Sequence, residues 1–72
     1  MSVGKNGITA GTIIQLDKEL ERRGLVKVKL LRAFLGETVD RKEAAAELAM
    51  KGRAKLVQVV GNVVVLHRPK KN

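Results

Sequence analysis

The chain has 72 residues, with 15 Lys or Arg against 7 Asp or Glu, and its formal net charge is +8. This length predicts a single domain with a small core, and the 44% of apolar residues exceeds what disordered chains contain. The absence of Cys excludes disulfide scaffolds and thiolate metal sites. No apolar run approaches the ~20 residues of a membrane span, and the first residues lack the pattern of a signal peptide, so we expect a cytoplasmic protein.

The first periodic segment predicts a helix over residues 10–23. Its large apolar residues recur at steps of three and four and share one helical face: Ile13, Leu16 and Leu20. Thr9 is suited to the N-cap, and Gly24 is suited to end the helix.

After Gly24 the apolar period changes to two, which predicts a strand over residues 26–30. Lys27 and Lys29 alternate with the apolar residues and therefore point to the same, solvated side. Residues 32–39 show no clean period and contain a glycine, and we expect a loop there.

A second helix is predicted over residues 41–51. Asp40 and Glu43 have the spacing of a capping box, and an Ala-rich run follows until Gly52. We expect the buried face of this helix to consist of small side chains with one leucine: Ala44, Ala45, Leu48 and Ala49.

The end of the chain predicts a β-hairpin. Residues 56–60 and 63–66 are rich in β-branched side chains, and the two residues Gly61 and Asn62 connect them. Pro69 ends the last strand, and residues 70–72 form a short basic tail.

The order of helices and strands predicts an α/β fold, a small two-layer sandwich in which the helices pack on one mixed β-sheet. Strands that alternate with helices imply parallel neighbours joined by crossovers, and the final hairpin adds an antiparallel pair. Because only Ser2 and Val3 precede the first glycine, any strand before the first helix must be short.

The segment Gly4-Lys5-Asn6-Gly7, which we call the GKNG loop, lies directly before the first helix. Its two glycines permit a sharp backbone turn, and the start of a helix offers free amides to an anion. Lys5 adds a positive charge, and Asn6 can form hydrogen bonds to a sugar or a base. The pattern matches the GxxG loop with which KH domains clamp nucleic-acid backbone, although ordinary turns also contain two glycines at this spacing.

Positive charge elsewhere on the chain agrees with an anionic partner, and nucleic acid is the commonest partner of a folded basic domain. The residues that could extend the positive surface beyond the loop are Lys27, Lys29, Arg53, Lys55 and Arg68. Taken singly, Lys27 and Lys29 are more often a solvated strand face than a binding site, and Arg53 and Lys55 have the same ambiguity. His67, the only histidine, is expected to be a structural or surface residue because no partner for a metal site is evident.

Four segments in chain order resemble consecutive landmarks of the CRM domain, also called the CRS1-YhbY family. They are the GKNG loop with Ile8 and Thr9, residues 25–29, residues 57–61 and residues 65–69. The resemblance implies an RNA-binding domain that is similar in fold to the C-terminal domain of translation initiation factor three. It also implies a partner such as ribosomal RNA or its precursor, and a role in ribosome assembly or as an RNA chaperone.

The resemblance covers residues 1–69 as a single CRM-like domain, but the first helix and most of the first strand of the family pattern have no counterpart here. The aromatic residue that often takes the place of His67 is also absent. The RNA-binding residues implied by the match are the GKNG loop, with the five basic residues as neighbours.

Two alternatives remain open. One is a protein-interaction module that uses an exposed sheet edge, and the other is a KH-like binder of single-stranded nucleic acid, although the final hairpin does not fit the KH order of elements. Folds that stack bases on aromatic side chains are disfavoured because Phe34 is the only aromatic residue. We expect no enzyme and no cofactor, since the chain has no Cys, one His and carboxylates mostly at spacings that suit helix surfaces.

Overall fold

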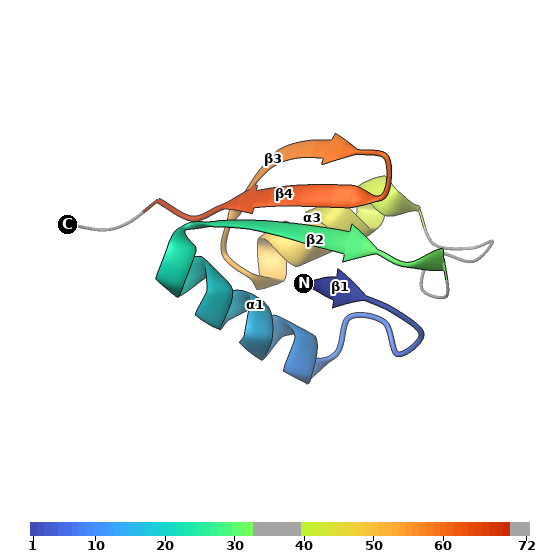
Figure 1. Ribbon diagram of the computed structural model, residues 1–72, viewed down its shortest axis with the longest axis horizontal. Coiled ribbons are helices and arrows are strands. Elements are labelled where there is room, and N and C mark those ends of the chain that lie inside the picture. The colour runs from blue at the N-terminus through green and yellow to red at the C-terminus, as the bar shows by residue number, and fades with distance from the viewer. Residues whose placement is uncertain (33–39, 70–72) are drawn as a thin grey trace.

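The computed structural model describes residues 1–32 and 40–69. Four strands form one sheet and two helices pack on it, which confirms the predicted two-layer α/β sandwich (Figure 1). In chain order the elements are β1 (Ser2–Val3), α1 (Ala10–Arg23), β2 (Leu25–Leu30), α3 (Arg41–Lys51), β3 (Lys55–Val60) and β4 (Val63–His67). The loop expected within residues 32–39, which includes Phe34, and the tail expected at 70–72 lie outside the described residues, except for Arg32.

The strands follow the order β1-β2-β4-β3 across the sheet. The expectation of parallel neighbours is confirmed for β1 and β2, but it is wrong for β2 and β3, because β4 lies between them and is antiparallel to both. The turn at Gly61 and Asn62 folds β4 back along β3, as predicted. Val64 and Leu66 of β4 are fully buried whereas most of β3 is exposed, so the more apolar strand takes the central place.

The core lies between the sheet and the two helices. Its fully or almost fully buried side chains come from β1, from both helices and from the two central strands: Val3, Leu16, Leu20, Val26, Val28, Leu30, Ala44, Ala45, Leu48, Val64 and Leu66. Ile13 and Ala49, which the sequence places on buried helix faces, are only partly buried against this cluster. In Figure 1, α3 lies behind the strands, and the opposite face of the sheet is open.

The caps explain where the helices begin and end. Thr9 caps α1, and Gly24 ends it with a φ of 73°, as predicted. Asp40 caps α3 by accepting a 2.8 Å hydrogen bond from the amide of Lys42, but the predicted capping box is not formed, because the Asp40 amide does not donate to the Glu43 carboxylate. The capping box occurs in α1 instead, where Thr12 takes the place of the usual Glu or Gln.

Gly52 allows the end of α3 to approach the middle of α1. A Cβ atom at this position would lie 2.7 Å from Cδ2 of Leu16 and 2.9 Å from the carbonyl oxygen of Leu48. The start of α3 is held by Arg41, whose guanidinium donates to the carbonyl oxygen of Gly61 at 3.0 Å. These contacts fix α3 between α1 and the hairpin. Within the described ranges, neither helix is long and apolar enough to cross a membrane.

Candidate functional site

The GKNG loop forms a tight turn between β1 and α1. The amide of Gly7 donates to the carbonyl oxygen of Gly4 at 2.9 Å, and Gly7 has a φ of 71°, a conformation that favours glycine. A Cβ atom on Gly4 would lie only 3.3 Å from Cδ1 of Leu31, so a side chain there would crowd the end of β2. The turn leaves Lys5 and Asn6 exposed at its tip.

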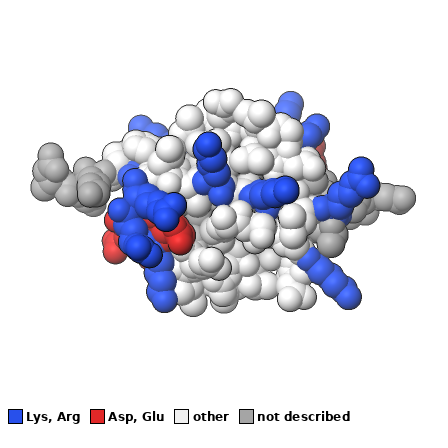
Figure 2. All heavy atoms as spheres, viewed as in Figure 1, with Lys and Arg blue, Asp and Glu red and all other residues white. Residues whose placement is uncertain are grey.

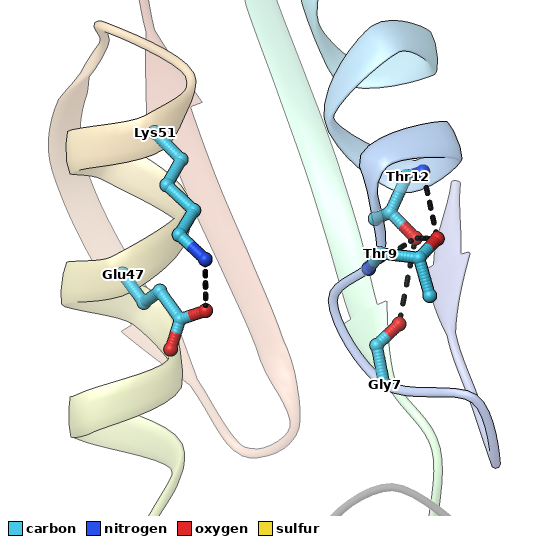
Figure 3. Close-up of polar contacts among 5 residues, drawn as sticks. All are labelled: Gly7, Thr9, Thr12, Glu47 and Lys51. Carbon is cyan, nitrogen blue, oxygen red and sulfur yellow. Dashed lines mark hydrogen bonds and ion pairs between the residues drawn. The ribbon is translucent and has the colours of Figure 1, made fainter.

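Two threonines connect the loop to the start of α1 (Figure 3). The hydroxyl of Thr9 accepts from the Thr12 amide at 3.2 Å, the Thr9 amide donates to the Thr12 hydroxyl at 3.3 Å, and that hydroxyl also reaches the carbonyl oxygen of Gly7 at 3.4 Å. Among the described residues, the amides of Ala10 and Gly11 have no acceptor. The first turn of α1 is therefore held firmly, and two of its N–H groups remain available to an anion.

The open face of the sheet carries both predicted lysines of β2. Lys29 lies opposite Ser2 of β1 and Val63 of β4, and Lys27 lies opposite Val65 of β4. Both are exposed, as the period of two predicts. Figure 2, seen from the same side as Figure 1, shows basic side chains at intervals over largely uncharged surface, while most of the visible acidic side chains gather at its left end. Apart from that end, the charged side chains on this face are mainly basic.

The predicted basic residues do not form one cluster. The loop follows β1 at the end of the sheet where β2 finishes, whereas Lys55 lies opposite His67 where β2 starts. A six-residue strand separates these ends, which corresponds to roughly 17 Å. Arg53 precedes Lys55 at the far end and is exposed, with a φ of 50°. The structure thus places Lys29 close to the loop, Lys27 farther along β2, and Arg53 and Lys55 at the opposite end.

The Arg68 side chain is engaged inside the protein. Its Nη2 atom lies 2.8 Å from the carboxylate of Asp17 on α1 and donates to the carbonyl oxygen of Gly52, and its side chain is only 20% exposed. Its amide also donates to the carbonyl oxygen of Gly24 at 2.8 Å. Arg68 therefore connects the end of β4 with both helices. His67, beside it, is exposed on the open sheet face, as expected for a surface residue.

A hollow on the helix side of the molecule lies next to the GKNG loop. We call it the α1–α3 hollow, and the residues that line it are Ile8, Thr9, Ala10, Ile13, Ile14 and Lys51. The Lys51 ammonium lies 2.9 Å from the Glu47 carboxylate on α3, across from Thr9 and Thr12 at the start of α1 (Figure 3). The sequence does not reveal this hollow, because its walls are far apart in the chain and meet only where Gly52 brings α3 to α1.

No metal centre can be assembled from the part of the chain that the structure describes, since no three His, Asp or Glu residues there are grouped suitably. The features that could bind a ligand are therefore the exposed loop, the lysines of the open sheet face and the apolar hollow. Together they offer positive charge and apolar surface to a ligand.

Several known proteins are similar in sequence to this chain. A protein of Methanocaldococcus jannaschii named as a probable RNA-binding protein is 43% identical over 68 residues, which is 94% of this chain and 49% of that protein. Proteins of Pseudomonas aeruginosa and Bacillus subtilis with the same kind of name are 38% and 39% identical, covering 97% and 96% of this chain and 66% and 69% of their own lengths. The chain thus spans from about half to about two thirds of the length of these relatives.

The fold is also similar to a solved structure. The solution structure of a Staphylococcus aureus protein superposes with a TM-score of 0.78 at 39% sequence identity, and the match covers 99% of this chain and 71% of that one. The model of the CRS1 / YhbY (CRM) domain matches residues 1–68, which includes the loop, both helices and all four strands. This chain therefore belongs to the CRS1/YhbY (CRM) domain family.

Proposed function

We propose that this chain binds RNA and that the GKNG loop clamps the sugar-phosphate backbone. The observation that carries the proposal is the tight turn that exposes Lys5 and Asn6 beside unpaired helix amides, on a protein with a net charge of +8. The names of the relatives, which state RNA binding, support RNA as the polyanion.

Each part of the loop has a distinct task in this proposal. The Lys5 ammonium neutralises a phosphate, the Asn6 amide donates to a phosphate or ribose oxygen, and the glycines let the RNA backbone approach closely. Lys29 and then Lys27 continue the path along the open sheet face with further phosphate contacts. Arg53 and Lys55 lie at the far end, so only a longer RNA reaches them.

Exchanging the charge at the loop tip tests the clamp. The double variant Lys5→Asp with Asn6→Asp should abolish binding of a single-stranded RNA oligonucleotide in fluorescence anisotropy, because two carboxylates then face the phosphates. Its thermal unfolding should hardly change, since both side chains are exposed.

The matched control makes the same change in charge elsewhere. Lys42→Asp with Gln58→Asp alters an exposed lysine at the start of α3 and an exposed glutamine on β3, which lies at the opposite edge of the sheet from β1. This control should keep most of the affinity. Equal losses in the two double variants would mean that binding follows net charge and that the loop is only a turn.

The cellular task that we propose is assistance in ribosome assembly or a more general RNA chaperone activity. Crosslinking the protein to RNA in an extract of its own cells, followed by sequencing of the attached RNA, separates these tasks. Enrichment of ribosomal precursor RNA supports the assembly role, and recovery of all RNA classes in proportion to their abundance supports the chaperone role.

The exposed edge strand β3 favours a second candidate function, the binding of a protein partner. Leu56, Val57 and Val60 are 43%, 56% and 53% exposed on this edge, and an unpaired edge can accept a further strand. In this case Val57→Lys should weaken capture of the partner and leave RNA affinity unchanged or slightly raised.

A further inference from the structure

We propose that the α1–α3 hollow receives one unstacked base of the same RNA strand whose backbone lies on the GKNG loop. This inference rests on the proposed function and extends it. It assigns single-stranded RNA, with at least one base turned out of the stack, as the class of ligand, and it names the residues that contact the base.

The position of the hollow supports this assignment. Ile8 lines the hollow and directly follows Gly7, the last residue of the loop, while Thr9 and Ala10 continue the same wall. A nucleotide whose phosphate contacts the loop therefore has this hollow as the nearest described cavity for its base. The hollow has a volume of about 540 Å³, which is ample for a single base.

The lining also fits the chemistry of a base. Three isoleucines and an alanine present aliphatic surface, and Ile14 is 57% exposed although the helix around it is well ordered by its caps. Aliphatic side chains can cover the flat face of a base, as apolar linings do in most small-ligand sites. The described part of the chain has no Phe, Tyr or Trp, and His67 lies on the open sheet face away from the hollow, so aliphatic packing is the means available there.

Lys51 supplies a polar group at the rim. Its ammonium donates one hydrogen bond to Glu47 at 2.9 Å, which leaves hydrogens that can reach a ring nitrogen or carbonyl oxygen on the edge of a base. The same contact offsets the charge of Glu47. Lys51 is the charged residue in the lining, and the lining contains no acidic residue.

Charge and continuity favour RNA over a second copy of the chain as the occupant. Two copies of a chain with a net charge of +8 repel one another. An RNA strand is attracted by the same charges, and it is already placed beside the hollow by the loop.

A scan with abasic nucleotides tests the inference. The ligand is a single-stranded RNA of about eight nucleotides, within the range that single-strand binders occupy, with one base removed at a time. The proteins are the natural chain, Ile14→Ser, and the control Val57→Ser, because Val57 has nearly the same exposure, 56%, on the distant strand β3. Binding is measured by fluorescence anisotropy, and folding by circular dichroism.

The expected result is position-specific. For the natural chain and Val57→Ser, removal of a base at one or two positions should weaken binding about five- to tenfold, the loss expected when one buried apolar face disappears. For Ile14→Ser the intact RNA should already bind about that much more weakly, and the abasic positions should have little further effect.

Three other results would contradict the proposal, and they differ in what else they affect. If the affinity is the same at every abasic position and Lys5→Asp with Asn6→Asp still abolishes binding, the base site is overturned and the clamp stands. Binding that survives this double variant overturns the clamp as well. A natural chain that sediments as a dimer and becomes a monomer in Ile14→Ser shows that a second copy occupies the hollow.

Discussion

At the scale of single residues, Arg53 stands out by its backbone. Among the described residues it is the non-glycine residue with a positive φ, 50°, between the end of α3 and the start of β3. Such a conformation costs a non-glycine residue about 1 kcal/mol. Its side chain is exposed, so packing in the core does not require an arginine at this position.

Two substitutions at Arg53 distinguish the effect of its backbone conformation on stability from the effect of its charge on binding. Arg53→Gly should raise the free energy of unfolding by up to about 1 kcal/mol, whereas Arg53→Ala should not, as measured by urea denaturation. If Arg53 contacts a phosphate of a long RNA, both variants should make the slope of log affinity against log salt shallower by about 0.7. Unchanged slopes would remove Arg53 from the RNA path.

The contacts of Arg68 indicate a structural role that its sequence position does not reveal. Its guanidinium bonds Asp17 and the carbonyl oxygen of Gly52, and these partners lie on or at the end of different helices. The sequence alone shows only a basic residue near the end of a strand. The burial of its side chain, which no local pattern reveals, is what ties it to the protein.

We expect Arg68→Ala to act on stability more than on binding. The change leaves the Gly52 carbonyl without this donor and removes the packing of the side-chain stem, which should lower the free energy of unfolding by about 1–3 kcal/mol. Asp17→Asn should cost at most about 1 kcal/mol, because that carboxylate is half exposed. A loss of RNA affinity larger than that of Lys5→Ala, at unchanged stability, would contradict the structural role.

At the scale of elements, the two helices meet where a glycine permits it. Gly52 has an ordinary φ of −83°, so glycine is required there by space and not by the backbone angle. Gly11, in the first turn of α1, is the opposite case, since an added Cβ would make only ordinary contact at 3.7 Å with the Thr9 hydroxyl.

The same substitution should therefore have opposite effects at these two glycines. Gly52→Ala should lower the free energy of unfolding by about 1–3 kcal/mol, since its Cβ meets Leu16 and the backbone of Leu48. Gly11→Ala should raise it by up to about 1 kcal/mol, because alanine favours the helix. Denaturant unfolding measures both, and a stable Gly52→Ala variant would show that α3 can shift away from α1.

The elements themselves follow closely from local signals. The period of Ile13, Leu16 and Leu20, together with Thr9 and Gly24, determines α1, and the alternation in residues 26–30 determines β2. The position of β4 between β2 and β3 could not be deduced, because strand order depends on how much apolar surface each strand buries against both helices. The capping box escaped prediction because Thr12 replaces the usual longer acceptor.

At the scale of the whole molecule, the arrangement of charge decides what the site can do. The candidate RNA-binding residues are spread along the sheet: the loop and Lys29 lie close together, Lys27 lies farther along β2, and Arg53 and Lys55 lie at the opposite end. The loop itself was predictable, since its glycines and the start of α1 adjoin in the chain. The α1–α3 hollow was not, because it depends on the packing of one helix against another.

The salt dependence of binding reports how many phosphates this surface contacts. With Lys5, Lys29 and Lys27 on successive phosphates of a single strand, the slope of log affinity against log salt should be about −2, from roughly −0.7 for each phosphate. Titrations of a short single-stranded RNA at several salt concentrations measure it. A flat profile would show that electrostatic contacts do not drive binding.

An NMR titration of the ¹⁵N-labelled chain with a short single-stranded RNA tests most directly whether the GKNG loop holds the RNA backbone. We predict that the largest amide shifts occur at Gly4, Lys5, Asn6 and Gly7 and in the first turn of α1, with smaller shifts at Lys29. Shifts confined to β3, or to the end of the sheet that carries Arg53 and Lys55, would contradict the claim.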